Sequence, residues 1–81
     1  MNMQDAIKWR TEGQWHYAEL GPIAYRVTDK ASPADRADIE TCLKERAAIL
    51  LDSPDEHVYL ASDGLTFTGK DAKREILAAM A

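Results

Sequence analysis

The chain has 81 residues, of which 46% are hydrophobic and 30% charged, and its formal net charge at pH 7 is −4. This balance excludes an intrinsically disordered chain and predicts one small folded domain over residues 1–81. Cys42 is the single cysteine, which excludes an intramolecular disulfide, and no apolar run approaches the length of a membrane span. We therefore expect a cytoplasmic protein whose core depends on packing alone.

Residues 7–28 show the alternation of apolar and polar residues that is typical of half-buried strands. The residues expected to face a helix are Ile7, Trp9, Trp15, Tyr17, Ile23, Tyr25 and Val27. Glu12-Gly13 and Gly21-Pro22 fit the turns between the segments, and Gly21-Pro22 suits a type II′ hairpin. The pattern predicts a three-stranded antiparallel meander.

The stretch from Ser32 to Leu51 predicts one long helix. Ser32 is a good N-cap, Pro33 suits the first helical position, and Asp35 completes a capping box. Apolar residues then recur every three or four positions, and we expect them to face the sheet: Ile39, Cys42, Leu43, Ala47 and Leu50, widened by Ile49 and Leu51. Asp52-Ser53-Pro54 ends the helix, because a residue before proline disfavours the helical conformation.

The C-terminal third predicts two short strands and a second helix. The strands are His57–Ser62 and Leu65–Thr68 around an Asp63-Gly64 turn. Val58 and Leu60 are expected to point inward, and Leu65 and Phe67 to share one face. The helix runs from about Gly69 to Met80, starts at a Thr68/Asp71 capping box, and buries Ala72, Ile76, Leu77 and Met80. The full order is β-β-β-α-β-β-α, an α+β fold with a mostly antiparallel sheet and two helices packed on one face. Residues 1–6 fit either a short helix capped by Asn2 or an irregular lead-in.

Acidic charge is concentrated in the middle of the chain. Residues 1–28 and 57–81 are each neutral, so residues 29–56 hold the whole net charge of −4. An element of this kind suits a basic protein surface and disfavours duplex DNA. The residues predicted to form an acidic, partner-binding patch are Asp35, Asp38, Glu45, Asp52, Asp55 and Glu56. The alternative is a helix face that is merely solvated.

A basic surface is predicted on the outer face of the meander, where Lys8, Arg10, His16 and Arg26 lie opposite the apolar side. Such a face can contact a DNA groove or an RNA backbone. Three strands followed by a helix over residues 7–51, with Trp9 and Trp15, resemble the arm-type DNA-binding domains of phage integrases, which implies nucleic-acid binding. We favour the alternative that these few charges only solvate an open sheet face.

No combination of residues predicts catalysis, a metal site or a cofactor. His16, Cys42 and His57 are the only histidine and cysteine residues, and their spacing matches no metal motif. The segment 64–70 has the spacing of a phosphate-binding loop, but Asp71 follows where serine or threonine is needed. We therefore expect a protein that is not an enzyme.

In size, acidity and lack of a catalytic motif, the chain is similar to small phage-encoded inhibitors of the anti-CRISPR type. Because the chain starts at Met1 and shows no tag, we expect a complete small reading frame, and its product is expected to be a monomer or homodimer. The resemblance implies that the protein acts in the host cytoplasm. It also implies a partner: a larger bacterial protein or ribonucleoprotein complex whose nucleic-acid-binding surface is blocked. The alternatives are a small nucleic-acid-binding regulator that uses the basic face, and a homodimer formed through an exposed strand edge.

Overall fold

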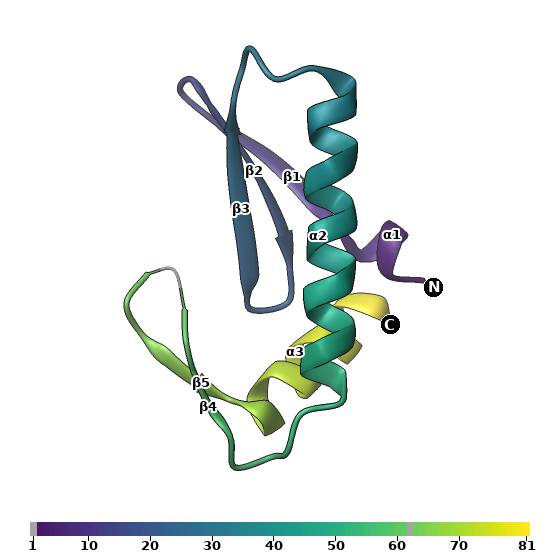
Figure 1. Cartoon of the computed structure of the whole chain (residues 1–81), viewed down its shortest axis with the longest axis vertical. Coiled ribbons are helices and arrows are strands. Elements are labelled where there is room, and N and C mark those ends of the chain that lie inside the picture. Colours follow the sequence, from purple (N-terminus) through teal and green to yellow (C-terminus); the bar gives the residue numbers. More distant parts are fainter. Residues whose placement is uncertain (1, 62) are drawn as a thin grey trace.

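The structure is a computed structural model that describes residues 2–61 and 63–81 (Figure 1). The helices are α1 (Met3–Ala6), α2 (Pro33–Leu51) and α3 (Gly69–Met80), and the strands are β1 (Lys8–Glu12), β2 (Trp15–Leu20), β3 (Ile23–Thr28), β4 (Val58–Leu60) and β5 (Thr66–Thr68). This order confirms the predicted α+β fold and adds the short helix α1, whose cap Asn2 accepts a hydrogen bond from Asp5 N–H at 3.0 Å. Ser62, the predicted end of the fourth strand, lies outside the described residues.

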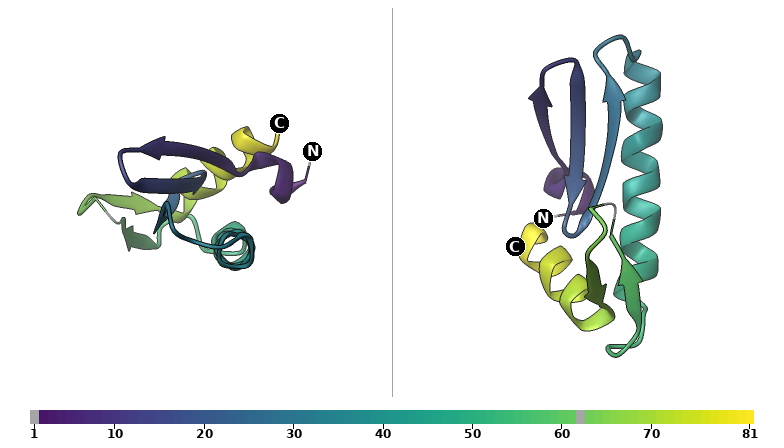
Figure 2. Two further views of the ribbon diagram at one scale, coloured as in Figure 1. Left: turned by 90° about the horizontal axis from the view of Figure 1, so that it is seen from above. Right: turned by 90° about the vertical axis from the view of Figure 1, so that its left-hand side faces the viewer.

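The strands form two antiparallel sheets. The larger one has the order β1-β2-β3, and β4 pairs only with β5 in the smaller one. Figure 1 shows α2 running along the larger sheet, with the β4–β5 hairpin and α3 gathered near the C-terminal end of α2. In both views of Figure 2 the two termini lie close together, beside the last turn of α3.

Helix α2 begins and ends where the sequence predicts. Ser32 N–H donates to Asp35 Oδ2 at 3.0 Å and Asp35 N–H donates to Ser32 Oγ at 3.1 Å, which confirms the capping box. The buried residues of the helix are Leu43, Ala47 and Leu50. Cys42 and Ile49, predicted in the buried stripe, are exposed, because each precedes a buried residue by one position and so lies about 100° away around the helix.

The core forms where α2 meets β2 and α3. Its fully buried large side chains are Leu20, Leu43 and Ile76, one from each of these elements, and alanines fill the space between them. Gly21, with a φ of +59°, lets the β2–β3 turn lie directly on α3, since a Cβ there would meet Ile76 Cγ1 at 2.7 Å. Leu77, which was predicted to be buried, is 56% exposed on the outer side of α3.

The start of α3 is joined to the segment that follows α2. Thr68 Oγ1 accepts a hydrogen bond from Asp71 N–H at 3.1 Å, which is one of the two hydrogen bonds of the predicted capping box. The Asp71 carboxylate pairs with Arg74 instead of forming the second one. Gly69 N–H donates to His57 O at 2.8 Å. A Cβ on Gly69 would lie 2.1 Å from Pro54 O, so only glycine fits at this point of close approach.

The faces of the meander differ from the prediction in β2. Ala18 lies opposite both Trp9 and Tyr25 and is fully buried, and these two partly buried residues share its α2 side of the sheet. Trp15 and Tyr17 therefore lie on the outer face, and the prediction that they face the helix was wrong. The reason is the length of the two loops. Residues 13–14 form the first loop, where Glu12-Gly13 was predicted, and residues 21–22 form the second, as predicted. A loop of two residues places odd-numbered residues of β1 and β3 opposite even-numbered residues of β2.

The β4–β5 hairpin shows the same kind of inversion. Tyr59 faces inward opposite Phe67, whereas Val58 and Leu60 are 60% and 76% exposed, contrary to the prediction. Ala61 N–H donates to the carbonyl of Leu65 at 2.7 Å, so the hairpin loop has three residues instead of two. One extra residue exchanges the faces of the strand.

We expect Gly69→Ala to destabilise the protein by about 2–3 kcal/mol, because the new methyl group overlaps the Pro54 carbonyl, a backbone group that cannot easily move away. Urea unfolding of the purified variant measures this loss. Gly13→Ala is the control, since nothing lies within 4 Å of the position that its new methyl group would take and only its φ of +61° carries a cost, of about 1 kcal/mol. Equal losses in the two variants would contradict the steric explanation.

Candidate interaction surfaces

Three of the predicted acids form one stripe on α2. Asp38, Glu45 and Asp52 are spaced seven residues apart and all are exposed. That spacing places them on the side of the helix opposite Leu43 and Ala47, over a length of about 21 Å. None of the three takes part in a salt bridge of the described residues. We call these three residues the α2 acidic face.

The other predicted acids have different surroundings. Asp35 is exposed one turn before Asp38, but its carboxylate is used in the capping box. Glu56 is exposed in the loop after the helix. Asp55 in the same loop forms an ion pair with Lys73, so its charge is already balanced. The structure thus brings together Asp35 and the α2 acidic face and leaves Asp55 and Glu56 beyond the end of the helix.

The ion pair between Asp55, in the loop after α2, and Lys73, in α3, connects these two segments. Lys73 Nζ also donates a hydrogen bond to Ser53 O at 2.8 Å. The hydrogen bond from Lys73, and then its positive charge, lower the pKa of the exposed Asp55 carboxyl below its ordinary value of 3.8. The folded state therefore favours the ionised form of this group.

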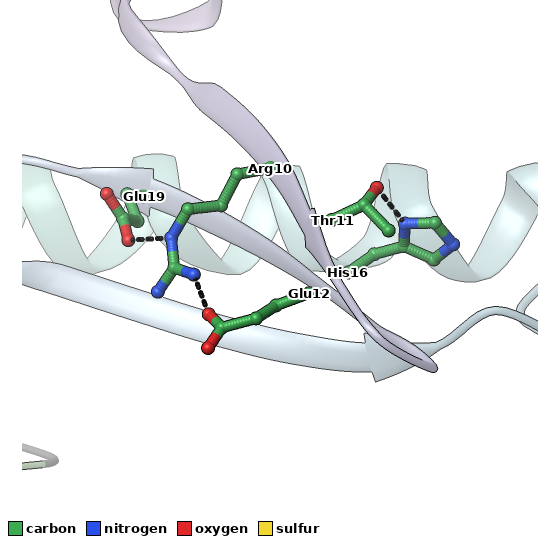
Figure 3. Close-up of polar contacts among 5 residues, drawn as sticks. All are labelled: Arg10, Thr11, Glu12, His16 and Glu19. Atoms are coloured by element: carbon green, nitrogen blue, oxygen red, sulfur yellow. Dashed lines mark hydrogen bonds and ion pairs between the residues drawn. The ribbon is translucent and has the colours of Figure 1, made fainter.

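The outer face of the larger sheet carries Lys8, Arg10, Trp15, Tyr17 and Arg26, which we call the outer sheet face. His16, predicted to share it, lies on the opposite side of the sheet, so that part of the prediction was wrong. The register places His16 opposite Thr11, and Figure 3 shows the 2.9 Å hydrogen bond between Thr11 Oγ1 and His16 Nδ1. The same two-residue loops that reverse β2 account for this change.

Arg10 is neutralised on this face by two carboxylates. Its Nε donates to Glu19 Oε1 at 2.9 Å and its Nη1 pairs with Glu12, as Figure 3 shows. The hydrogen bond to Glu19, followed by the one to Glu12, raises the pKa of Arg10 above its ordinary value. Arg10 is therefore less available to a phosphate than Lys8 and Arg26, which form no salt bridge within the described chain.

Aromatic side chains are the part of this face that sequence reasoning missed. Arg26 Cζ lies 4.1 Å from the centroid of the Trp15 ring, and Arg10 Cζ lies 4.2 Å from that of Tyr17. Such stacking stabilises both partners and shields the rings from water. A signal was present in β2, because Glu19 shares the strand face of Trp15 and Tyr17, and a carboxylate marks the solvent side.

The residues considered for metal binding or phosphate binding lie apart. Cys42 is exposed on α2, and His57 packs against Tyr59 in a tilted arrangement, with ring centroids 4.6 Å apart and an interplanar angle of 39°. No group of three or more potential metal ligands occurs in the described residues. In the segment that has the spacing of a phosphate-binding loop, residues 66–68 form strand β5. The backbone of Gly69 packs closely against the carbonyl oxygen of Pro54, which occupies the space beside it.

Comparisons of the chain with protein-family models, with curated proteins and with solved structures give no match. None of the helices in the described part of the chain has the length and apolar character needed to cross a membrane. The function is therefore inferred from the surfaces of this chain.

We expect Asp55→Asn to lower the unfolding temperature at neutral pH, because it removes the ion pair with Lys73. The native pKa of Asp55 is lowered, so its contribution is fully present above 3.8 and is lost as the pH falls through the lowered value. Thermal unfolding of both proteins between neutral and acidic pH measures the difference, which should vanish at the acidic end. Glu56→Gln is the control, and a difference independent of pH would contradict the role of the ion pair.

Proposed function

We propose that the protein is a non-enzymatic interaction module that inhibits a larger bacterial protein or ribonucleoprotein complex, in the manner of an anti-CRISPR protein. The α2 acidic face is the contact, and it covers lysine and arginine residues that otherwise hold nucleic acid. The observation that carries the proposal is the stripe of Asp38, Glu45 and Asp52, exposed and without an ion-pair partner in the described chain.

The position of Asp52 supports a role outside the fold. It is the C-cap of α2, and no basic residue lies in the last turn of the helix. The C-terminal end of a helix carries a partial negative charge, so an acid there lowers stability. Folding alone therefore does not explain this charge, whereas a basic partner does.

The shape of α2 also supports the proposal. The helix spans 19 residues, and in the right-hand view of Figure 2 it lies along one margin of the molecule, where no other element covers its outer side. A straight, charged ridge of this kind suits a positively charged channel. Complementary charge accelerates association and makes it sensitive to salt.

The direct test is inhibition of target-DNA binding by a panel of purified CRISPR effector complexes, measured by gel shift. We expect inhibition by the native chain and at least tenfold weaker inhibition by Asp38→Lys/Glu45→Lys, because each change replaces attraction by repulsion. Asp29→Lys/Glu75→Lys is the control, with the same net charge but exposed sites away from this face. No inhibition across the panel would reject the anti-CRISPR proposal, and equal inhibition by both variants would reject the contact surface.

Asp52→Lys should change the stability of the protein and its binding to the partner in opposite directions. We expect it to raise the free energy of unfolding by about 0.3–1 kcal/mol, since a cation at the helix C-terminus is favourable. The same variant should bind the partner more weakly. Urea unfolding measures the first effect, and a loss of stability would contradict the unfavourable interaction of the Asp52 charge with the end of the helix.

A second candidate function, nucleic-acid binding by the outer sheet face, is supported by the stacked Arg26 and Trp15. Bases stack on aromatic rings and on guanidinium groups in single-strand binding proteins. Fluorescence titration with a single-stranded oligonucleotide at low salt tests it. Lys8→Ala/Arg26→Ala should weaken binding, whereas His16→Ala, on the opposite side of the sheet, should not. Absence of binding at low salt would reject this candidate.

A further inference from the structure

A groove with a volume of 380 Å³ opens between β3, the C-terminal half of α2 and the β4–β5 hairpin. Residues 22–25 line one side, residues 59–61 with Phe67 line another, and Arg46, Ile49 and Leu50 contribute from α2. The volume falls within the range of about 300–1,000 Å³ that is usual for ligand sites. Ile49 and Leu60 in its lining are 62% and 76% exposed, which is a large apolar area for so small a protein.

Two strand edges meet this groove. β3 is the last strand of its sheet, and β4 pairs with β5 on one side only. Each lines the groove with three successive residues, Ile23 to Tyr25 and Tyr59 to Ala61. Side chains of successive strand residues point to opposite faces, so three in a row indicate that the edge of the strand, with its backbone, faces the groove.

The backbone of Ala24 is free to pair with a further strand. Leu20 and Ile23 close the two-residue turn and form a hydrogen-bonded pair, so the N–H and C=O of the next residue, Ala24, point away from β2. No other backbone hydrogen bond of the described residues uses these groups. An unpaired edge of this kind is a template for strand addition.

Arg46 gives the groove a charge preference. It is the single charged residue in the lining and takes part in no salt bridge within residues 2–61 and 63–81. A free arginine beside apolar side chains selects a carboxylate. In a chain with a net charge of −4, this cation differs in sign from the neighbouring α2 acidic face.

We propose that this groove binds an extended segment of a partner protein by strand addition to β3. The segment pairs through its backbone with Ala24, places alternate apolar side chains against Ile49 and Leu60, and sets an acidic side chain at Arg46. A helix would offer no free backbone groups to the edge, and a small apolar molecule would leave Ala24 unpaired. The inference is independent of the function proposed for the α2 acidic face.

The test starts from a phage-displayed library of random ten-residue peptides selected on the purified full chain. We expect enriched peptides with apolar residues at every second position and one acidic residue. Fluorescence polarisation of the best synthetic peptide then compares Leu60→Asp with Val58→Asp. Both residues are exposed on the same face of β4, but only Leu60 lines the groove, so Leu60→Asp should weaken binding about tenfold and Val58→Asp less than about twofold.

Two further variants test the edge and the charge. Ala24→Pro removes a donor that β2 does not use, so the fold should persist, as circular dichroism can verify, while peptide affinity falls about tenfold. Arg46→Glu should abolish the preference for an acidic residue. Hydrogen exchange should show slower exchange of the Ala24 amide in the native chain when the peptide is bound.

Four outcomes would overturn the proposal. These are the absence of enriched peptides, apolar residues at every third or fourth position, equal effects of Leu60→Asp and Val58→Asp, and unchanged affinity in a folded Ala24→Pro protein. A fifth outcome would also overturn it: if the native chain sediments as a dimer and Leu60→Asp abolishes the dimer, the groove is assigned to a second copy of the chain.

Discussion

The burial of one side of α2 is the constraint on which the rest of the structure depends. Leu43, Ala47 and Leu50 lie in a single cluster with residues from α1, β2 and α3, and the described chain has no second core. Helices α1 and α3 and strands β2 and β3 contact α2 directly, whereas β1 is held by β2, and the β4–β5 hairpin by α3. Because one side of α2 is committed to the core, the opposite side is free to carry the unpaired charges of Asp38 and Glu45.

The two proposed surfaces adjoin along α2. Arg46 and Ile49 of the groove lie within about one turn of Glu45, so the sign of the surface charge changes over a short distance. A partner with a basic surface and a neighbouring extended, acidic segment is complementary to both. Electrostatic attraction at the α2 acidic face would then raise the association rate, and strand addition at the groove would provide specificity.

Loop length decides which residues of each hairpin face the core. In the meander, two-residue loops turn the even-numbered residues of β2 inward, which buries Ala18 and exposes Tyr17 on the outer sheet face. In the smaller hairpin, a three-residue loop turns Tyr59 inward and leaves Leu60 at the groove. The side chains alone favoured the opposite choices, because Tyr17 is larger than Ala18 and Leu60 is more apolar than Tyr59. The placement of the outer sheet face and the groove follows from these loops.

The sequence by itself determined the order of the elements, the bounds and caps of α2, and the cap at Thr68, because these depend on contacts within four residues of the chain. It also identified the acids of α2, since helical periodicity relates Asp38 to Glu45 without knowledge of distant segments. Only the tertiary structure decided the division into two sheets, the inward faces of β2 and β4, and the meeting of β3 with the hairpin. Those features depend on pairing and packing between segments far apart in the chain, where several arrangements satisfy the same local pattern and the common core selects one.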